Sequence, residues 1–194
     1  MTKDILNQNA QSQLINLARE SILYYLNHHK IPKQTNLADC MKNMLDPLFL
    51  KQRSAFVTLY LQGQLRGCVG SLIASQSLVD EVINQSINAA MNDKRFRPLN
   101  KTEWQDLTIE ISILSPMHQV QSYSEIILEK HGVILQKNNK SAVFLPKVAK
   151  EQNWDLEKLL TQLSLKAGLN AKDWQENAQF YVFEALECRE GYKN

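Results

Sequence analysis

The chain has 194 residues, of which 44% are hydrophobic and 22% are charged, and its net charge is +2. This composition is typical of a folded globular domain and argues against long disordered regions. The small net charge argues against binding to nucleic acid or anionic lipid through a strong electrostatic field. Since no apolar run is long enough to span a bilayer and residues 1–9 lack the apolar core of a signal peptide, we expect a cytoplasmic protein.

The first part of the chain predicts a helix followed by a β-hairpin. Apolar residues recur at helical spacing from Ser12 to Asn27, and Ile31-Pro32 is expected to end that helix. A further helical turn or two is expected within Leu37–Leu45. The β-branched and aromatic residues of Ala55–Leu61 predict a strand, and Gln62-Gly63 predicts a turn into a second strand.

Glycines are dense in that second strand. Gly63, Gly67 and Gly70 lie within eight residues, and glycine is used where the backbone takes positive φ or approaches another group closely. We therefore expect the strand to bulge or bend at Gly67, next to Cys68.

The middle of the chain predicts a second helix and the clearest strand. Ser77 is expected to cap a helix that runs to about Asn92. In the stretch from Leu107 to Ile113, apolar residues alternate with Thr108, Glu110 and Ser112, which predicts a strand with one buried face.

The last third predicts short elements. These are a short helix from Ser124 to His131, a hairpin turn at Asn138-Asn139, a helix from Asp155 to Gly168, and a final strand over Gln179–Leu186. Paired strands with helices between the pairs indicate an α+β fold with a mostly antiparallel central sheet flanked by helices. We expect one domain over residues 1–194, with a smaller α/β lobe within about residues 120–175.

Cys68 is the first candidate for chemistry. A thiol flanked by glycines on a bent strand can be exposed, and Arg66 would favour its thiolate form. Because Arg66 and Cys68 share a face of a regular strand, this interpretation requires the bulge at Gly67. The alternative is that Cys68 is a small core residue, as free cysteine often is.

A basic stretch and a histidine are the other candidates. Lys94, Arg95 and Arg97 follow a predicted helix, and Arg95 would suit a carboxylate or phosphate; alternatively, these cations offset the helix dipole at the surface. His131 is either a general base or a helix cap. The three cysteines are widely spaced and His28 and His29 point to different helix faces, so we predict no metal site.

Several of these motifs occur together in one known family. The stretch Leu65-Arg66-Gly67-Cys68-Val69-Gly70, Asp93 with Arg95-Phe96, and His131-Gly132-Val133 follow one another in the chain. With Lys166-Ala167-Gly168-Leu169 they resemble the AMMECR-one domain family, whose bacterial and archaeal members are called AmmeMemoRadiSam system protein A. The resemblance covers about residues 12–187.

The resemblance implies a fold with a larger and a smaller lobe, with both chain ends in the larger one. It also implies an association, in pathway or gene neighbourhood, with a Memo-family protein and a radical S-adenosylmethionine protein. It implies a functional turn at Arg66, Gly67, Cys68 and Gly70, to which we add Asp93 and Arg95 as ligand-binding candidates. It implies no reaction and no cofactor.

Three functions remain open at this level. The chain is an enzyme or enzyme component with a small-molecule ligand beside Cys68, a binding module that scaffolds a protein partner, or, least favoured by the charge, a nucleic-acid-binding protein. The substrate and the oligomeric state are not encoded in any motif that we recognise.

Overall fold

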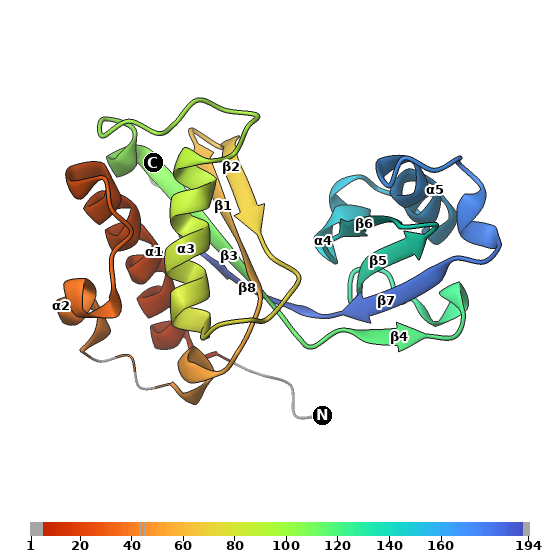
Figure 1. Ribbon diagram of the computed structural model, residues 1–194, viewed down its shortest axis with the longest axis horizontal. Coiled ribbons are helices and arrows are strands. Elements are labelled where there is room, and N and C mark those ends of the chain that lie inside the picture. The colour runs from red at the N-terminus through yellow and green to blue at the C-terminus, as the bar shows by residue number, and fades with distance from the viewer. Residues whose placement is uncertain (1–5, 43, 45, 192–194) are drawn as a thin grey trace. The chain divides into compact units, whose positions relative to one another are not determined.

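The computed structural model describes residues 6–42, 44 and 46–191, so residues 1–5 and, within the predicted helical turns of Leu37–Leu45, Asn43 and Leu45 lie outside the described residues. The chain divides into two compact units. The larger unit runs to Ile113 and resumes at Leu186, and the smaller unit is Leu114–Ala185. Over the described residues each unit contains one four-stranded antiparallel sheet, which confirms the predicted α+β class (Figure 1).

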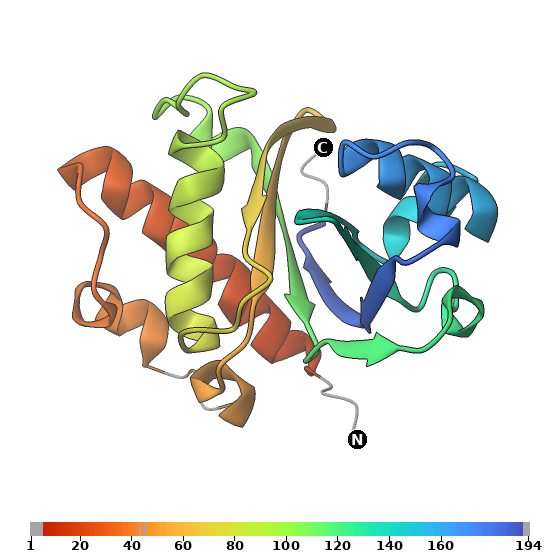
Figure 2. The same ribbon diagram turned by 45° about the vertical axis from the view of Figure 1, so that its right-hand side comes forward.

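The larger unit packs helices on one face of a sheet whose strand order is β2-β1-β3-β8. Both long helices, α1 and α3, lie on the same side of this sheet (Figure 2). Its elements are α1 (Gln8–His28), the 3₁₀ turn Gln34–Leu37, α2 (Ala38–Met41), the 3₁₀ turn Pro47–Leu50, β1 (Ala55–Leu61), β2 (Gln64–Gly70), α3 (Leu78–Met91), the 3₁₀ turn Trp104–Asp106, β3 (Leu107–Leu114) and β8 (Ala185–Arg189).

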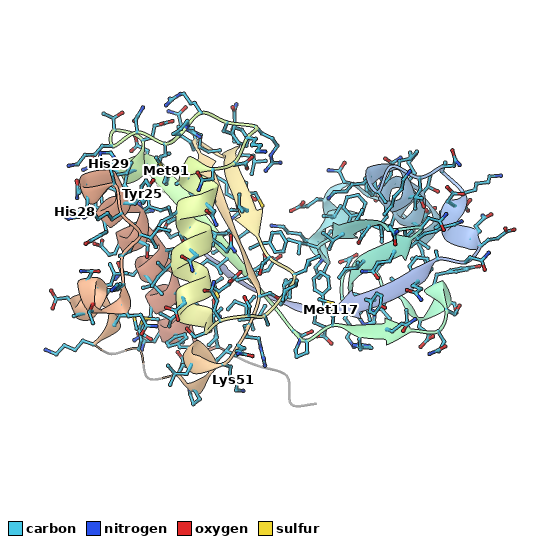
Figure 3. The ribbon with its side chains drawn as sticks, in the orientation of Figure 1. Tyr25, His28, His29, Lys51, Met91 and Met117 are labelled. Atoms are coloured by element: carbon cyan, nitrogen blue, oxygen red, sulfur yellow. The ribbon has the colours of Figure 1, made fainter. Side chains whose placement is uncertain are left out.

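Helix α1 is longer at its start than the periodicity predicts. The Asn7 side chain accepts a hydrogen bond from the Ala10 N–H at 2.8 Å and caps the helix. At the other end, His29 takes a left-handed conformation with φ of 54°, so the helix ends before Ile31-Pro32 is reached. Figure 3 labels Tyr25 at this end of α1 and Met91 at the end of α3, and both pack against the core of the larger unit.

The β1–β2 hairpin contains the predicted turn and a bulge. Gln62 and Gly63 have φ of 51° and 77°, which confirms the turn. The register pairs Leu59 with Gly67 but Tyr60 with Leu65, so Arg66 is the extra residue of a bulge directly before Gly67.

The two faces of this sheet differ in chemistry. Side chains of Val57 and Leu59 in β1 and of Ile109 and Ile111 in β3 belong to the core with α1 and α3. Alternation places Thr58, Cys68 and Glu110 on the opposite face, which we call the Cys68 face.

The prediction that β3 has one buried face is wrong. Thr108, Glu110 and Ser112 on the Cys68 face are 5%, 3% and 1% exposed. The strand lies between β1 and β8, so residues of both neighbouring strands flank its polar side chains. Arg189 of β8 lies 3.6 Å from Glu110 and packs over the Tyr60 ring of β1.

The smaller unit has its own sheet, with strand order β4-β7-β5-β6, and its own core. Its elements are β4 (His118–Val120), the 3₁₀ turn Tyr123–Glu125, β5 (Gly132–Lys137), β6 (Lys140–Phe144), α4 (Lys147–Glu151), α5 (Leu156–Lys166), the 3₁₀ turn Asp173–Gln175 and β7 (Gln179–Phe183). No helix of the described chain is both long and apolar enough to cross a membrane.

In the smaller unit, the predicted hairpin turn and the predicted ends of the helix after Asp155 are confirmed. Asn138 and Asn139 both have positive φ in the β5–β6 turn, and the Asp155 side chain accepts from the Lys158 N–H at 2.8 Å to cap α5. Gly168 has φ of 73° just after α5.

Two predictions in this part of the chain are wrong. The helix expected over Ser124–His131 is only the 3₁₀ turn Tyr123–Glu125, which Ser122 caps by accepting from the Ser124 N–H. The strand expected over Gln179–Leu186 is divided at Glu184 between β7 and β8, which belong to different sheets. Glu184 is the point of division because its backbone N–H donates to Ser115 Oγ and its carbonyl accepts from the Ser115 N–H.

Candidate functional site

Cys68 lies on the polar face of the larger sheet. It pairs with Thr58 of β1, and the Thr58 hydroxyl donates a hydrogen bond to Cys68 Sγ at 3.3 Å. The neighbouring Val69 points the other way and packs against the core. Cys68 is half-buried and is not part of the hydrophobic core of the larger unit, so it is not a core residue of the kind considered above.

The backbone of Cys68 is held from the free edge of the sheet. Strand β2 is an edge strand, and edge strands present unpaired N–H and C=O groups. Here the Cys68 N–H donates to Asp93 Oδ2 at 2.9 Å, and Arg95 Nη2 donates to the Cys68 carbonyl oxygen at 3.3 Å. The loop after α3 therefore takes the place of a neighbouring strand at Cys68.

Asp93 and Arg95 form a bidentate ion pair. Arg95 Nε donates to Asp93 Oδ1 at 3.0 Å, and Arg95 Nη2 donates to Asp93 Oδ2 at 2.7 Å. The Arg95 hydrogen bond holds the pKa of Asp93 well below its usual range, against the opposing effect of burial, and the same bond raises the pKa of Arg95. The Asp93 side chain is 7% exposed but that of Arg95 is 58% exposed, so a buried carboxylate holds an accessible cation beside Cys68.

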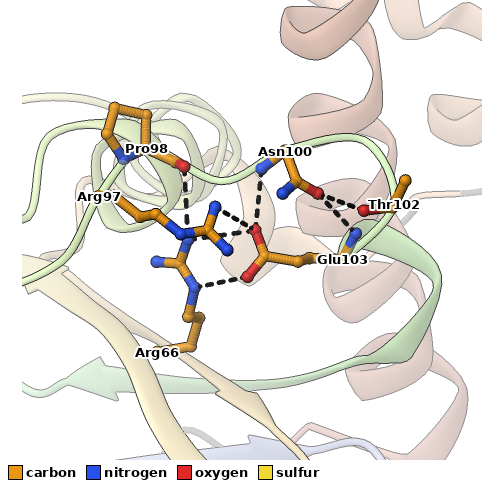
Figure 4. A network of polar contacts seen from close by, with 6 residues as sticks. All are labelled: Arg66, Arg97, Pro98, Asn100, Thr102 and Glu103. Carbon is orange, nitrogen blue, oxygen red and sulfur yellow. Dashed lines mark hydrogen bonds and ion pairs between the residues drawn. The ribbon is translucent and has the colours of Figure 1, made fainter.

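Arg66 is paired with a different carboxylate, that of Glu103. Its Nε donates to Glu103 Oε1 at 3.0 Å, and its Nη2 donates to Glu103 Oε2 at 3.3 Å and to the Pro98 carbonyl at 3.4 Å (Figure 4). Glu103 Oε2 also accepts from Arg97 Nη1 and from the Asn100 N–H. Burial raises the pKa of Glu103, but the hydrogen bonds from Arg66 and Asn100 outweigh it and lower the pKa overall.

The structure thus brings Cys68, Asp93 and Arg95 together, and it ties Arg66 into the network that holds the loop at residues 98–103. The bulge explains how Arg66 and Cys68, two residues apart, have different surroundings. A contact of Arg66 with a ligand stays a prediction.

The two glycines of the motif make room for other parts of the larger unit. A Cβ atom on Gly67 would lie 2.1 Å from the Ala89 carbonyl oxygen, so glycine allows α3 to approach β2. A Cβ atom on Gly70 would lie 2.3 Å from Cγ of Phe56, so the Phe56 ring packs over Gly70. Close packing accounts for both glycines, and ligand binding by them stays a prediction.

His131 belongs to the smaller unit, whereas Cys68 belongs to the larger one. The His131 Nδ1 atom accepts from the Ile127 N–H at 3.1 Å, and the His131 backbone N–H donates to the Ile127 carbonyl at 2.9 Å. Burial lowers the pKa of His131. These bonds close the turn before β5, and a catalytic role for His131 stays a prediction. Among the residues that the structure describes, no three His, Cys, Asp or Glu side chains are grouped so as to hold a metal ion.

Sequence reasoning missed polar residues that share the Cys68 face. Thr58 stands opposite Cys68 on one side and opposite Glu110 on the other, and Arg189 of β8 is ion-paired with Glu110. The alternation in β1 and β3 was a signal that Thr58 and Glu110 face away from the core. Which residues stand opposite each other depends on strand order and register, and neither could be read from the chain.

Comparison with known proteins identifies the family. The AMMECR1 family model matches residues 15–188. Protein Mbar_A1807 of Methanosarcina barkeri is 33% identical over 181 residues, which cover 91% of this chain and 88% of that protein. A protein of Methanococcus aeolicus is 37% identical over 155 residues, covering 75% and 78%.

A solved structure is similar as well. The crystal structure of the uncharacterized protein PH0010 from Pyrococcus horikoshii matches with a TM-score of 0.84 and 30% sequence identity, and the match covers 96% of this chain and 94% of that one. The family model, the relatives and the shared fold all span most of the chain. The protein therefore belongs to the AMMECR1 family.

Proposed function

We propose that this protein is a cytoplasmic component of a pathway that includes a Memo-family protein and a radical S-adenosylmethionine protein. We propose further that it contributes a ligand-binding or catalytic site centred on Cys68. The pathway part rests on the resemblance of the sequence motifs. The site part rests on the structure around Cys68.

One observation carries the site proposal: an accessible guanidinium is fixed beside Cys68, a residue of intermediate exposure. Arg95 is bound through two hydrogen bonds to Asp93 and donates to the Cys68 carbonyl, while more than half of its side chain is open to solvent. Such a cation attracts a carboxylate, phosphate or sulfonate group. The site therefore suits a small ligand with an anionic group.

The chain offers a matched control for Arg95. Arg97 lies in the same loop, its side chain is 64% exposed, and it is paired with Glu103 instead of Asp93.

The other cysteines interfere little with labelling of Cys68. Burial raises the pKa of Cys188 to about 12 and also raises the pKa of Cys40, which is replaced in a Cys40→Ser background.

The test compares iodoacetate with iodoacetamide, which differ mainly in charge. The rate of each reaction at Cys68 is followed by peptide mass spectrometry on the native protein. We expect Arg95→Gln to lower the iodoacetate-to-iodoacetamide rate ratio about five-fold, as loss of a nearby charge of about 1 kcal/mol predicts. Arg97→Gln should leave the ratio unchanged. Equal ratios in both variants and the parent, or labelling of Cys68 only on unfolding, would contradict the site proposal.

The pathway proposal has a separate test. Cys68→Ser protein with native circular dichroism is expected to co-purify with the Memo-family or radical protein as the parent does, but to leave the pathway inactive in cells. Pathway output that persists in this variant would remove Cys68 from the proposed role.

A scaffolding function is the second candidate, and two exposed apolar side chains favour it. Leu50 and Ile73 are 76% and 73% exposed, and their segments are joined by the bridge between Gln52 and Ser77. Contiguous exposed apolar patches mark protein-interaction sites, and we propose that Leu50 and Ile73 belong to one such patch. The double variant Leu50→Ser and Ile73→Ser should then lose the partner in pull-downs while Cys68 labelling stays unchanged. Retention of the partner would argue against scaffolding through this surface.

A further inference from the structure

The smaller unit contains a cavity that the proposed Cys68 site does not use. Its volume is about 570 Å³, and it lies at the turn end of the β5–β6 hairpin, next to the start of β7. Ligand cavities in proteins have volumes of about 300–1,000 Å³, so this one is large enough for a small molecule. Of its lining residues, Lys137 is partly buried and the others are exposed, so a ligand reaches the cavity from solvent.

We propose that this cavity binds a small neutral saccharide through hydrogen bonds to its hydroxyl groups. The inference concerns the smaller unit alone and does not rest on the proposed Cys68 site.

The lining is polar throughout, and most of it is carboxamide. Five of the eight lining side chains are carboxamides, namely Gln136, Asn138, Asn139, Asn177 and Gln179. Each carries two N–H donors and an oxygen that accepts, so it pairs with a ligand hydroxyl as donor or as acceptor. An apolar ligand would remove water from these groups without replacing the lost hydrogen bonds. The lining therefore favours a ligand rich in hydroxyl groups.

Three polar side chains of the lining form a row across the strands, which we call the Gln136 row. Strand β5 lies between β6 and β7 (Figure 1), and Gln136 of β5 stands opposite Ser141 of β6 and opposite Gln179 of β7. Leu135, next to Gln136, packs in the core, so alternation places the row on the opposite face. Neighbouring strands are about 4.8 Å apart, so the row is about 10 Å long and presents its groups along one edge of a small saccharide.

The groups of the Gln136 row are available to a ligand. Among the described residues, none of its three side chains makes a hydrogen bond. Turn geometry accounts for the other carboxamides, because Asn138, Asn139 and Asn177 have φ of 50°, 61° and 52°, a conformation that asparagine tolerates. The residues of the row lie in regular strands, where no such backbone requirement applies.

The charges of the lining favour a neutral ligand. Lys137 and Lys140 are its charged residues, and the ammonium groups of both are bound to backbone carbonyls. Lys137 Nζ donates to the Asp173 carbonyl at 2.8 Å and is ion-paired with the Asp173 carboxylate at 3.6 Å, and Lys140 Nζ donates to the Gly168 carbonyl. No carboxylate is among the lining residues, so a cationic ligand lacks a partner there.

The test follows the protein by ¹H–¹⁵N NMR during titration with D-glucose, D-galactose, D-ribose and maltose. We expect at least one of these sugars to shift the side-chain NH₂ signals of Gln136 and Gln179 and the backbone signal of Ser141, and to do so saturably. The double variant Gln136→Val and Gln179→Val removes both carboxamides but keeps residues suited to strands. It should weaken the binding about ten-fold, as followed at Ser141.

The chain supplies a matched control in Gln119, an exposed glutamine of β4 in the same sheet that does not line the cavity. Gln119→Val should leave the affinity unchanged. Gln136→Glu separates a loss of binding from a folding defect, because it keeps the shape of the side chain but removes its N–H donors, and it should also weaken the binding.

Several results would overturn the inference. They are a lack of shifts with every sugar, a double variant that binds as tightly as the parent, and an equal loss of affinity in Gln119→Val. Inorganic phosphate is titrated in parallel. If phosphate and none of the sugars shifts these signals, the cavity is an anion site at Lys137 and Lys140, and the inference is wrong. The labelling of Cys68 is measured separately, so none of these results decides the proposed Cys68 site.

Discussion

Two arginine–carboxylate pairs of the larger unit, each with an arginine that links β2 to the segment after α3, differ in exposure. In the pair of Arg66 with Glu103, the side chains are 10% and 11% exposed. In the pair of Asp93 with Arg95, the carboxylate is 7% exposed but the guanidinium is 58% exposed. Both arginines donate two hydrogen bonds to their carboxylate.

The difference separates a structural role from a functional one. A buried pair contributes to the fold mainly because removing one partner leaves the other charge buried and unpaired. A half-exposed arginine contributes little to stability, but it remains available to a ligand. The bulge at Arg66 makes this separation within one strand, because it directs Arg66 to Glu103 and leaves Cys68 beside Arg95.

The largest expected effect is on the buried pair. Arg66→Gln leaves the Glu103 carboxylate with only the exposed Arg97 as a cationic partner, so we expect the free energy of unfolding to fall by about 3 kcal/mol. Arg97→Gln should lower it by less than about 0.5 kcal/mol. Urea denaturation of both variants measures the two losses. Similar losses would mean that exposure does not distinguish these arginines.

The next largest loss of stability is expected at Gly67, which lies between Arg66 and Cys68. Gly67→Ala places a Cβ atom 2.1 Å from the Ala89 carbonyl oxygen, so β2 and α3 must move apart, and we expect a loss of about 2 kcal/mol. Gly191→Ala is the control, because a Cβ atom there meets no atom within 4 Å. Thermal unfolding of both variants checks the prediction, and an unchanged melting temperature for Gly67→Ala would refute the close approach.

The contribution of Asp93 to the free energy of unfolding should depend on pH. Its pKa is lowered in the folded protein, so below about pH 5 the unfolded chain takes up a proton that the folded protein does not, and stability is lost as the pH falls. We expect Asp93→Asn to cost about 1.5 kcal/mol at pH 7 and to lose less stability than the parent between pH 5 and pH 3. Urea titrations at those three pH values, with the exposed Asp39→Asn as control, measure this. Parallel pH profiles for Asp93→Asn and the parent would show that the Asp93 carboxylate is not stabilised by folding.

A smaller stability effect than at Asp93 is expected at Arg95. Its guanidinium is mostly exposed, and the buried Asp93 carboxylate keeps its hydrogen bonds from the backbone N–H groups of Cys68 and residue 95, so Arg95→Gln should lower the free energy of unfolding by about 1 kcal/mol. The same variant is expected to change the charge selectivity of Cys68 labelling several-fold. A large stability loss with unchanged selectivity would reverse the assignment and make Arg95 the structural arginine.

Much of the fold was predictable where a few neighbouring residues decide it. Ser77 and Asp155 cap their helices through their own side chains, and Asn138-Asn139 forms its turn because both residues accept positive φ. Alternation predicted β3. The glycines around Cys68 predicted a bulge or bend at Gly67, and the structure has the bulge one residue earlier, with Arg66 as the extra residue. The basic stretch after α3 pointed to Arg95, and the family resemblance pointed to Asp93.

Elements decided by distant partners were not predictable. The continuous pattern of Gln179–Leu186 gives no sign that hydrogen bonds between Glu184 and Ser115 divide it between two sheets. Similarly, Arg66 resembles Arg95 as an arginine near Cys68, and only the position of Glu103 shows that it is tied into the loop at residues 98–103.

The sequence by itself determined the α+β class, the main helices and hairpins, and the thiol at the centre of the candidate site. The tertiary structure alone decided that Asp93 and Arg95 complete the edge of β2 at Cys68, and that Thr58 and Glu110 stand in line with it. The physical reason is the separation along the chain of the residues that interact. Caps, turns and periodicity depend on residues within about four positions of each other. The contacts at the candidate site join residues much farther apart along the chain, such as Cys68 with Asp93, 25 positions apart, and Thr58 with Glu110.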